Sequence, residues 1–178
     1  MKELLSLTFF IIILTSANGD WLNFRGSMGN GEANIKSISQ LSNTAPTSWK
    51  TTLPGRGLSS PILVKDKIYI TASSGPKQET LHVLCFSRDQ GDLVWERRFQ
   101  STGRTICHEK TCVAAPTMTS DGKVVVAQFS SNDIFCLNLK GDLIWLRGLT
   151  YDYPNAANGL GMSSSPVVAQ GVLIAQVE

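Results

Sequence analysis

The chain has 178 residues, and its 16 Lys and Arg residues against 14 Asp and Glu residues give a formal net charge of +2 at pH 7. Acidic and basic residues are interspersed, and the basic pair Arg97-Arg98 lies just after Trp95 without a basic stripe of interleaved aromatic residues around it. This charge distribution argues against nucleic acid as a partner.

The first 19 residues have the composition of an export signal. Lys2 precedes an apolar run at residues 9–14, and small residues follow at Ser16, Ala17 and Gly19. Because this run is too short to cross a bilayer, the pattern predicts a cleaved signal peptide at residues 1–19 rather than an uncleaved amino-terminal anchor. Cleavage after Ala17 is the alternative to cleavage after Gly19. We expect an exported protein, periplasmic or extracellular, with no membrane span after cleavage.

Residues 20–47 form a polar segment between the signal and the first strand-like run. Gly26, Gly29, Asn30 and Gly31 cluster in it, and no apolar alternation lasts more than a few residues. The segment is therefore predicted to be an irregular amino-terminal arm. From residue 48 to residue 178, short apolar runs are separated by turn signals and no helical period is sustained, which predicts an all-β fold.

A phrase of five residues occurs twice in the all-β part. Gly-Asp-Leu-Val-Trp at positions 91–95 recurs as Gly-Asp-Leu-Ile-Trp at positions 141–145, and a triplet of two small residues and a proline starts each unit. The repeated positions are Pro61, Pro116 and Pro166 at the starts and Gly91, Trp95, Gly141 and Trp145 near the ends. Self-similarity at a period of about 40 to 50 residues, built from short strands, is typical of β-propeller blades.

Each complete unit contains four strand-like runs and is predicted to form one four-stranded antiparallel blade. The expected strands are 58–64, 67–72, 80–87 and 92–99 in the first unit (58–99), 113–119, 123–129, 133–139 and 142–149 in the second (113–149), and 162–169 and 172–177 in the incomplete third (162–178). The predicted fold is thus a partial β-propeller of two full blades and part of a third. Since a propeller closes with typically four to eight blades, we expect the chain to be part of a longer protein.

The end of each unit resembles the repeat of the pyrroloquinoline-quinone-like (PQQ-like) β-propeller family, also called quinoprotein alcohol dehydrogenase-like. The family repeat is Ala-x-Asp-x-x-Thr-Gly-x-x-x-Trp; here Cys85, Ser87 and Gln90 stand for Ala, Asp and Thr, and Gly91 and Trp95 match. The second copy, 136–145, is one residue shorter. The resemblance implies that the glycine takes positive φ in the outer turn and that the tryptophan packs between neighbouring blades. Residues 20–31 also resemble the arm that precedes such repeats in exported bacterial proteins.

The resemblance is specific for the fold and weaker for chemistry, because many relatives hold no quinone. The dehydrogenases use an Asp, a Ca²⁺ held by Glu and Asn, a stacking Trp and in several cases a disulfide between adjacent cysteines, whereas Cys107 and Cys112 are not adjacent. We expect a non-catalytic scaffold that binds a protein or cell-envelope ligand and uses no cofactor. The alternative is a periplasmic dehydrogenase dependent on PQQ and Ca²⁺, with its active site outside this chain.

The four cysteines fall into two pairs. Cys107 and Cys112 lie in a polar stretch, and in an oxidising compartment a local disulfide is the leading interpretation. A metal site that includes His108 and Glu109, or two free thiols, are the alternatives. Cys85 and Cys136 hold the same place in successive units, so they are expected to be too far apart to pair and to be buried.

Three loops that link an outer strand to the next inner strand are expected on one face, at residues 52–57, 100–111 and 150–161. Each is polar, contains glycine and is longer than a tight turn, which favours a binding face. Candidate contact residues are Arg56, His108, Asp152 and Tyr153, with ordinary solvated loop residues as the alternative. His82 is expected to be a strand histidine with satisfied hydrogen bonds rather than a catalytic base.

Overall fold

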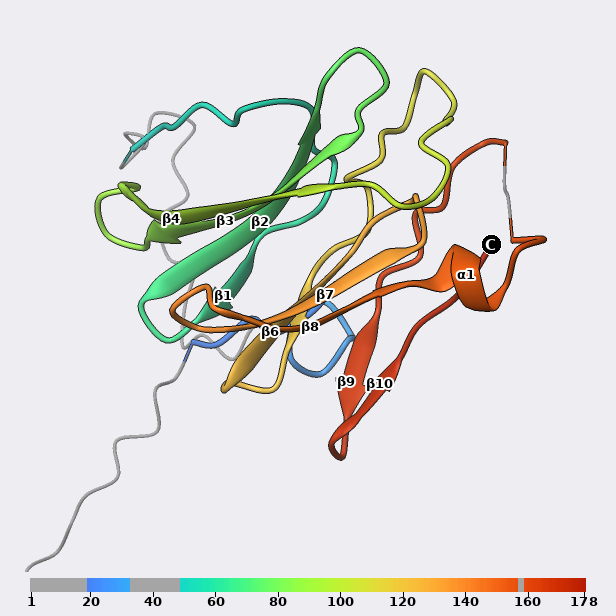
Figure 1. The fold of residues 1–178 in the computed structure, drawn as a ribbon. Coiled ribbons are helices and arrows are strands. Elements are labelled where there is room, and N and C mark those ends of the chain that lie inside the picture. Colours follow the sequence, from blue (N-terminus) through green and yellow to red (C-terminus); the bar gives the residue numbers. More distant parts are fainter. Residues whose placement is uncertain (1–18, 33–48, 157–158) are drawn as a thin grey trace, which may run out of the picture.

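The computed structural model describes residues 19–32, 49–156 and 159–178. This part of the chain forms two four-stranded antiparallel sheets and one two-stranded sheet, which fan out as neighbouring blades (Figure 1). The arrangement confirms the predicted partial propeller. Residues 1–18 of the predicted signal peptide and residues 33–47 of the predicted arm lie outside the described residues.

The first blade runs from its innermost to its outermost strand in chain order. β1 (Ile62–Val64), β2 (Lys67–Ser74), β3 (Thr80–Ser87) and β4 (Leu93–Gln100) pair with their sequence neighbours. β3 has the bounds that the sequence predicted. Its side chains alternate, so that Leu81 and Val83 join the core shared with the second blade while Leu84 joins a smaller core on the opposite face.

The second blade repeats this order with shorter strands. β5 (Thr119–Ser120), β6 (Val124–Gln128), β7 (Asp133–Asn138) and β8 (Leu143–Gly148) form its sheet, and β9 (Val167–Ala169) and β10 (Val172–Ile174) form the hairpin of the third unit. Between β8 and β9 lies a one-turn helix that the sequence did not predict, α1 (Leu149–Asp152). Across the described ranges, no helix is both long and apolar enough to cross a membrane.

The main core lies between the first two blades. It contains Val83 and Cys85 from the first blade and Val125 and Leu137 from the second, all fully buried. Phe99 and Phe135 stack across the same interface with ring centroids 4.1 Å apart. A second core between the second blade and the third unit packs Ile134 and Leu149 against Leu173 and Val177. Each blade is therefore stabilised by its neighbours.

The innermost strands are much shorter than predicted, and the prediction of 58–64, 113–119 and 162–169 as whole strands was wrong. The backbone N–H groups of Leu58 and Ser59 donate to the carbonyl oxygen of Ala114 in the next unit, at 3.2 Å each. The N–H of Ser60 donates to Thr117 Oγ1 at 3.0 Å. Leu58, Ser59 and Ser60 thus bond to the next unit, although Ser59 also contacts Thr71 of β2 through its hydroxyl, and Pro61 has no N–H with which to continue a strand ladder.

The start of the arm is paired with the innermost strands. Trp21 and Leu63 exchange two backbone hydrogen bonds of 2.8 and 2.9 Å, and the N–H of Ser120 donates to the carbonyl of Leu22 at 2.8 Å. The carboxylate of Asp20 accepts from the N–H of Lys65 at 2.8 Å. Residues 20–22 therefore connect the inner edges of both complete blades.

Candidate functional site

Trp95 and Arg97 of β4 together hold the outer turn of the second blade. The Trp95 indole is 9% exposed, and its Nε1–H donates to the carbonyl of Leu139 at 3.1 Å. Arg97 Nε donates to the carbonyl of Gly141 at 2.7 Å, and its guanidinium lies 5.4 Å from the centre of the Trp95 ring. Gly141 has φ of +86°, and a Cβ added there would lie 2.8 Å from the Trp95 ring. Only glycine fits this turn without strain.

Trp49 makes the same kind of contact with the first blade. Its Nε1–H donates to the carbonyl of Arg88 at 2.8 Å. Gly91 has φ of +73°, and a Cβ there would lie 2.4 Å from the Trp49 ring. The repeated glycine thus serves both the turn and the close approach of an indole from the preceding unit.

Trp145, the third tryptophan of this series, is 40% exposed. The expectation that it is buried like Trp95 was therefore wrong, because the described residues contain no following glycine turn for it to cover. Instead it borders a hollow of about 580 Å³, which we call the side groove. The groove is lined by Ile134, Trp145, Leu146, Arg147, Leu149, Tyr153, Leu173, Ala175 and Val177.

The structure divides the four predicted contact residues between two surfaces. Arg56 donates to the carbonyl of Glu109 at 2.5 Å, next to His108, and both side chains are exposed. Tyr153 lines the side groove, where Asp152 accepts a 2.7 Å hydrogen bond from Arg147. The sequence placed all four on one face because it gave no sign that α1 turns the third loop toward β8.

The loops at 52–57 and 100–111 and the end of the third loop at 159–161, which together we call the loop face, are tied to one another. Arg56 joins the first loop to the second through Glu109, and the N–H of His108 donates to the carbonyl of Leu160 at 2.9 Å. Gly161 packs so closely on Cys107 that an added Cβ would lie 2.6 Å from the Cys107 Cβ. These three segments therefore form one continuous surface.

A second hollow, of about 600 Å³, lies beside the loop face where the inner strands begin. This inner pocket is lined by Phe24, Leu58, Ser60, Lys110, Thr111, Ala115, Thr117, Ser163, Ser164 and Ser165. This pocket was not among the sites predicted from the sequence. The sequence feature that could have indicated it is the hydroxyl residue next to each proline of the repeat. These hydroxyls join successive units, because Thr117 Oγ1 accepts from the N–H of Ser60 and Ser165 Oγ accepts from the N–H of Thr117, at 3.0 Å each.

The inner pocket does not fit the cofactor set of the quinone dehydrogenases. Its lining offers hydroxyls, one ammonium and apolar groups, with neither a carboxylate nor an indole. Ca²⁺ prefers several oxygen ligands that include carboxylates, and these lining residues supply none. We therefore derive no quinone chemistry from this pocket.

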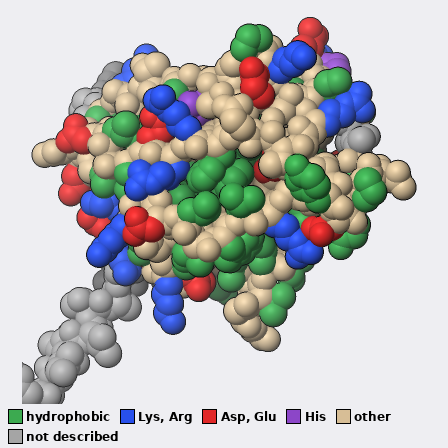
Figure 2. Space-filling view, in the orientation of Figure 1, with side chains coloured by type: hydrophobic (Ala, Val, Ile, Leu, Met, Phe, Trp, Pro, Cys, Tyr) green, Lys and Arg blue, Asp and Glu red, His purple; other side chains and the backbone are tan. Residues whose placement is uncertain are grey.

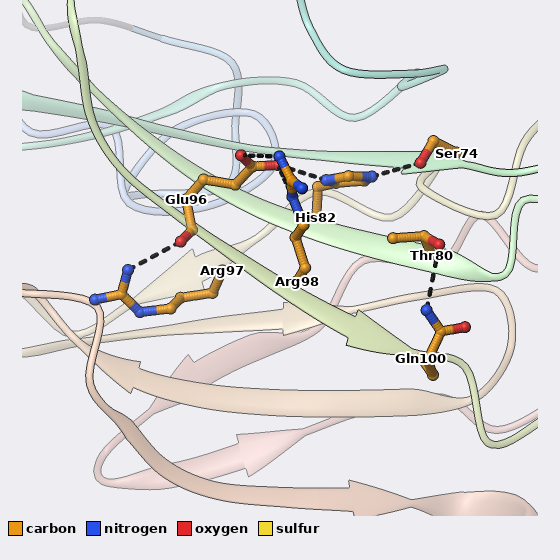
Figure 3. A network of polar contacts seen from close by, with 7 residues as sticks. All are labelled: Ser74, Thr80, His82, Glu96, Arg97, Arg98 and Gln100. Carbon is orange, nitrogen blue, oxygen red and sulfur yellow. Dashed lines mark hydrogen bonds and ion pairs between the residues drawn. The ribbon is translucent and has the colours of Figure 1, made fainter.

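His82 lies in a chain of polar contacts across three strands of the first blade (Figure 3). Its Nε2 lies 2.7 Å from Ser74 Oγ and its Nδ1 lies 2.7 Å from Glu96 Oε1. Arg98 donates two hydrogen bonds of 2.9 Å to the same carboxylate and, together with His82, lowers the pKa of Glu96 to about 2. The serine, histidine and carboxylate have the order of a hydrolase triad, but His82 is only 3% exposed. Both ring nitrogens have hydrogen-bond partners, so we interpret these residues as a structural network that links the three strands.

All four cysteines are free thiols in the structure. Burial raises the pKa of Cys85 to about 11 and also raises the pKa of Cys112. Cys107 is half-buried, and its sulfur lies 3.5 Å from Gln78 Nε2. Throughout the described ranges, no three His, Cys, Asp or Glu side chains are grouped closely enough to bind a metal, and this includes Cys107, His108, Glu109 and Cys112. The Cys107–Cys112 disulfide stays a prediction.

Stacked four-stranded sheets joined by tryptophan–glycine contacts define this chain as a segment of a β-propeller of the PQQ-like repeat type. The chain belongs to the family described as "Outer membrane protein assembly factor BamB", whose family model matches residues 38–177. This confirms the resemblance found in the repeats. No curated protein sequence matches the chain.

Among solved structures, the chain is similar to BamB from Moraxella catarrhalis, with a TM-score of 0.51 and 17% sequence identity. The match covers 73% of this chain and 33% of BamB, so the chain spans about a third of that relative's length. The quinohemoprotein alcohol dehydrogenase from Comamonas testosteroni has a TM-score of 0.49 and 19% identity, over 67% of this chain and 17% of that chain. These likenesses concern the fold.

Proposed function

We propose that this chain is a non-catalytic, exported scaffold that binds another protein of the cell envelope through the loop face. The observation that carries the proposal is the joining of three loops from successive units into one surface. Arg56 contacts Glu109, and His108 contacts Leu160. A surface fixed in this way loses little conformational entropy when a partner binds.

The loop face has the mixed chemistry of a protein-binding surface. Ile106 is 56% exposed and Leu160 is 66% exposed, and the exposed cations Arg56, Arg104 and Lys110 lie on the same loops. Protein interfaces combine an apolar centre with a polar rim. The partner that fits carries an apolar patch flanked by carboxylates.

The family description supports a protein partner, since an assembly factor acts on other proteins. It also supports export, in agreement with the signal-like first 19 residues. Amino-terminal sequencing of the protein from a cell-envelope fraction is expected to begin at Asp20. A mature protein that still begins at Met1 would contradict this part of the proposal.

Site-specific photo-cross-linking tests the loop face directly. A photoreactive residue in place of Ile106 is expected to form one discrete protein adduct in the native cell envelope. Arg56→Glu together with Lys110→Glu should abolish that adduct, because both substitutions place carboxylates opposite the partner's carboxylates. The matched control is the same photoreactive residue at the exposed position of Lys123, on the turn at the opposite end of the second blade.

Two outcomes would refute the proposed function. One is an adduct of equal yield at positions 106 and 123, and the other is an adduct that survives the charge reversals. Titration of the protein with PQQ and Ca²⁺ completes the test. We expect no saturable spectral change, and a saturable one would establish the dehydrogenase alternative.

A further inference from the structure

The inner pocket holds hydroxyl groups from all three units that still have a proton to donate. Ser60 Oγ makes no hydrogen bond with the described residues, while Thr117 Oγ1 and Ser165 Oγ each accept one backbone N–H and donate to none of them. A hydroxyl donates as well as accepts. Because Thr117 is only 2% exposed, its remaining donor has little access to bulk water and is available to an acceptor bound in the pocket.

Lys110 supplies the single charge in the lining of the inner pocket. Its ammonium forms no ion pair with the described residues. The backbone around it is held by His108, because the N–H of Lys110 donates to His108 Nδ1 at 3.2 Å and the N–H of Thr111 donates to the His108 carbonyl at 2.9 Å. A cation and hydroxyl donors without a carboxylate favour an anion that accepts several hydrogen bonds.

The inner pocket also has an apolar wall and continues into a second hollow. Phe24 and Leu58 of the wall are 52% and 53% exposed. Phe24 and Ser165 also line an adjoining hollow of about 380 Å³, whereas Lys110 and Leu58 line only the inner pocket. The adjoining hollow is completed by Asn23, Ser27, Met28, Gly29, Val167, Val168 and Ala169. The two hollows together form a groove with its positive charge at one end, which we call the inner groove.

The inner groove is separate from the apolar surface over β8. Figure 2 shows hydrophobic side chains gathered over that strand, but no residue of β8 lines either hollow of the groove. The groove is built instead from the arm, the starts of the inner strands and the loop that carries Lys110. A neighbour that packs on β8 therefore does not occupy it.

We propose that the inner groove binds the carboxyl terminus of a protein, with the terminal carboxylate at Lys110 and an apolar last side chain against Phe24 and Leu58. A chain end carries its carboxylate and its last side chain on one carbon atom, which matches a cation and an apolar wall in one pocket of about 600 Å³. Capture of a chain end through its carboxylate is a recurring mode of peptide recognition.

The rest of the bound segment lies in the second hollow. The chain passes Phe24, which lines both hollows, and reaches Asn23, whose side-chain amide offers a donor and an acceptor to a peptide backbone. The inference rests on the proposed function in taking a protein as the ligand. It assigns that ligand's chain end to a surface beside the loop face, and Lys110 borders both.

Peptide binding to the full-length protein tests the proposal. The probe is the N-acetylated peptide Ser-Ala-Ser-Ala-Leu with a free carboxyl terminus, and binding is followed by the NMR signals of the backbone amides of Lys110, Thr117 and Ser165. We expect saturable binding that shifts these signals and leaves the indole signal of Trp95 in place.

Three matched probes define what the groove recognises. The same peptide with a carboxamide end should bind at least about tenfold more weakly, because it lacks the charge. The carboxamide peptide Ser-Ala-Ser-Glu-Leu should be equally weak, because its carboxylate is on an internal side chain. Sodium acetate should also be at least about tenfold weaker than the probe, because it has no apolar side chain to bury.

Variants of the protein assign the contacts. Lys110→Gln should weaken binding of the probe at least about tenfold and leave binding of its carboxamide form unchanged. Ser60→Ala should also weaken binding, and since Ser60 Oγ has no partner among the described residues, the fold should keep its stability. Lys123→Gln is the control, because Lys123 is an exposed lysine on the turn at the opposite end of the second blade. An unchanged Trp95 indole signal shows that each variant is folded.

Several results would overturn the proposal. The probe could fail to bind, either carboxamide peptide or acetate could bind as tightly as the probe, or Lys110→Gln could weaken binding no more than Lys123→Gln. The cross-linking experiment fails separately. An adduct at position 106 without peptide binding would refute the inner groove alone, whereas peptide binding without a discrete adduct would refute the loop face and leave the groove in place.

Discussion

Replacing Trp95 by alanine removes an indole that joins the first two blades. The side chain is 9% exposed, packs on Tyr69 with ring centroids 5.8 Å apart, and donates its N–H to Leu139. Loss of a buried aromatic ring of this size costs about 3 to 5 kcal/mol, which includes the cavity left behind. The carbonyl of Leu139 also loses its indole donor, so we expect the upper half of this range.

Trp145→Ala is the matched control within the same chain. Its indole occupies the equivalent register position but is 40% exposed and has no following turn to cover, so we expect a loss of about 1 to 2 kcal/mol. Urea unfolding followed by far-UV circular dichroism at 25 °C measures both losses. If the losses in unfolding free energy of the two variants differ by less than about 1 kcal/mol, the role assigned to the buried Trp95 indole is wrong.

Three other predictions concern the turn, the thiols and the polar row. Gly141→Ala should destabilise the fold by at least about 1 kcal/mol more than Gly122→Ala, because both have φ near +85° but only Gly141 lies against an indole, and an equal loss would exclude packing as the cause. Mass spectrometry without reductant should find Cys107 joined to Cys112 with Cys85 and Cys136 unpaired, whereas a Cys85–Cys136 link would contradict the blade geometry. The lowered pKa of Glu96, about 2 against an ordinary 4.5, means that its ion pairs stabilise the fold above pH 4.5 and that this contribution is lost as the pH falls toward 2. Unfolding free energies of the wild type and Glu96→Gln should therefore converge on acidification, and a constant difference would show that these ion pairs do not contribute.

The parts of the fold that depend on local sequence were predictable. The alternation of residues 80–87 and their flanking turns predicted β3 with its observed bounds, and the glycines of the repeated phrase have the expected positive φ. The inner strands were overestimated because Leu58 and Ser59 bond to Ala114, more than fifty residues away. Such pairing leaves no local pattern, and a small-small-Pro start is compatible with either arrangement.

The candidate surfaces depended on contacts that the sequence did not reveal. Trp95 and Trp145 stand in nearly identical phrases, yet one is buried and the other lines a groove, because burial is decided by the neighbouring unit. Asp152 and Tyr153 were assigned to the loop face, but the single turn of α1 carries them to the side groove. Arg147 was not predicted as a site residue, because the position two residues after the tryptophan gains a role only through the neighbouring turn, as the hydrogen bond from Arg97 to Gly141 shows.

The pairing of residues 20–22 has a consequence for how the molecule folds. Trp21 meets a strand about forty residues further along the chain, and Leu22 meets one about a hundred residues further along. Contacts between such distant segments must close large loops, and they form late. Residues 20–22 are synthesised early, but they should be among the last to form their native hydrogen bonds. The backbone amides of Trp21, Leu63 and Ser120 should therefore gain protection from hydrogen exchange only after the second blade has formed.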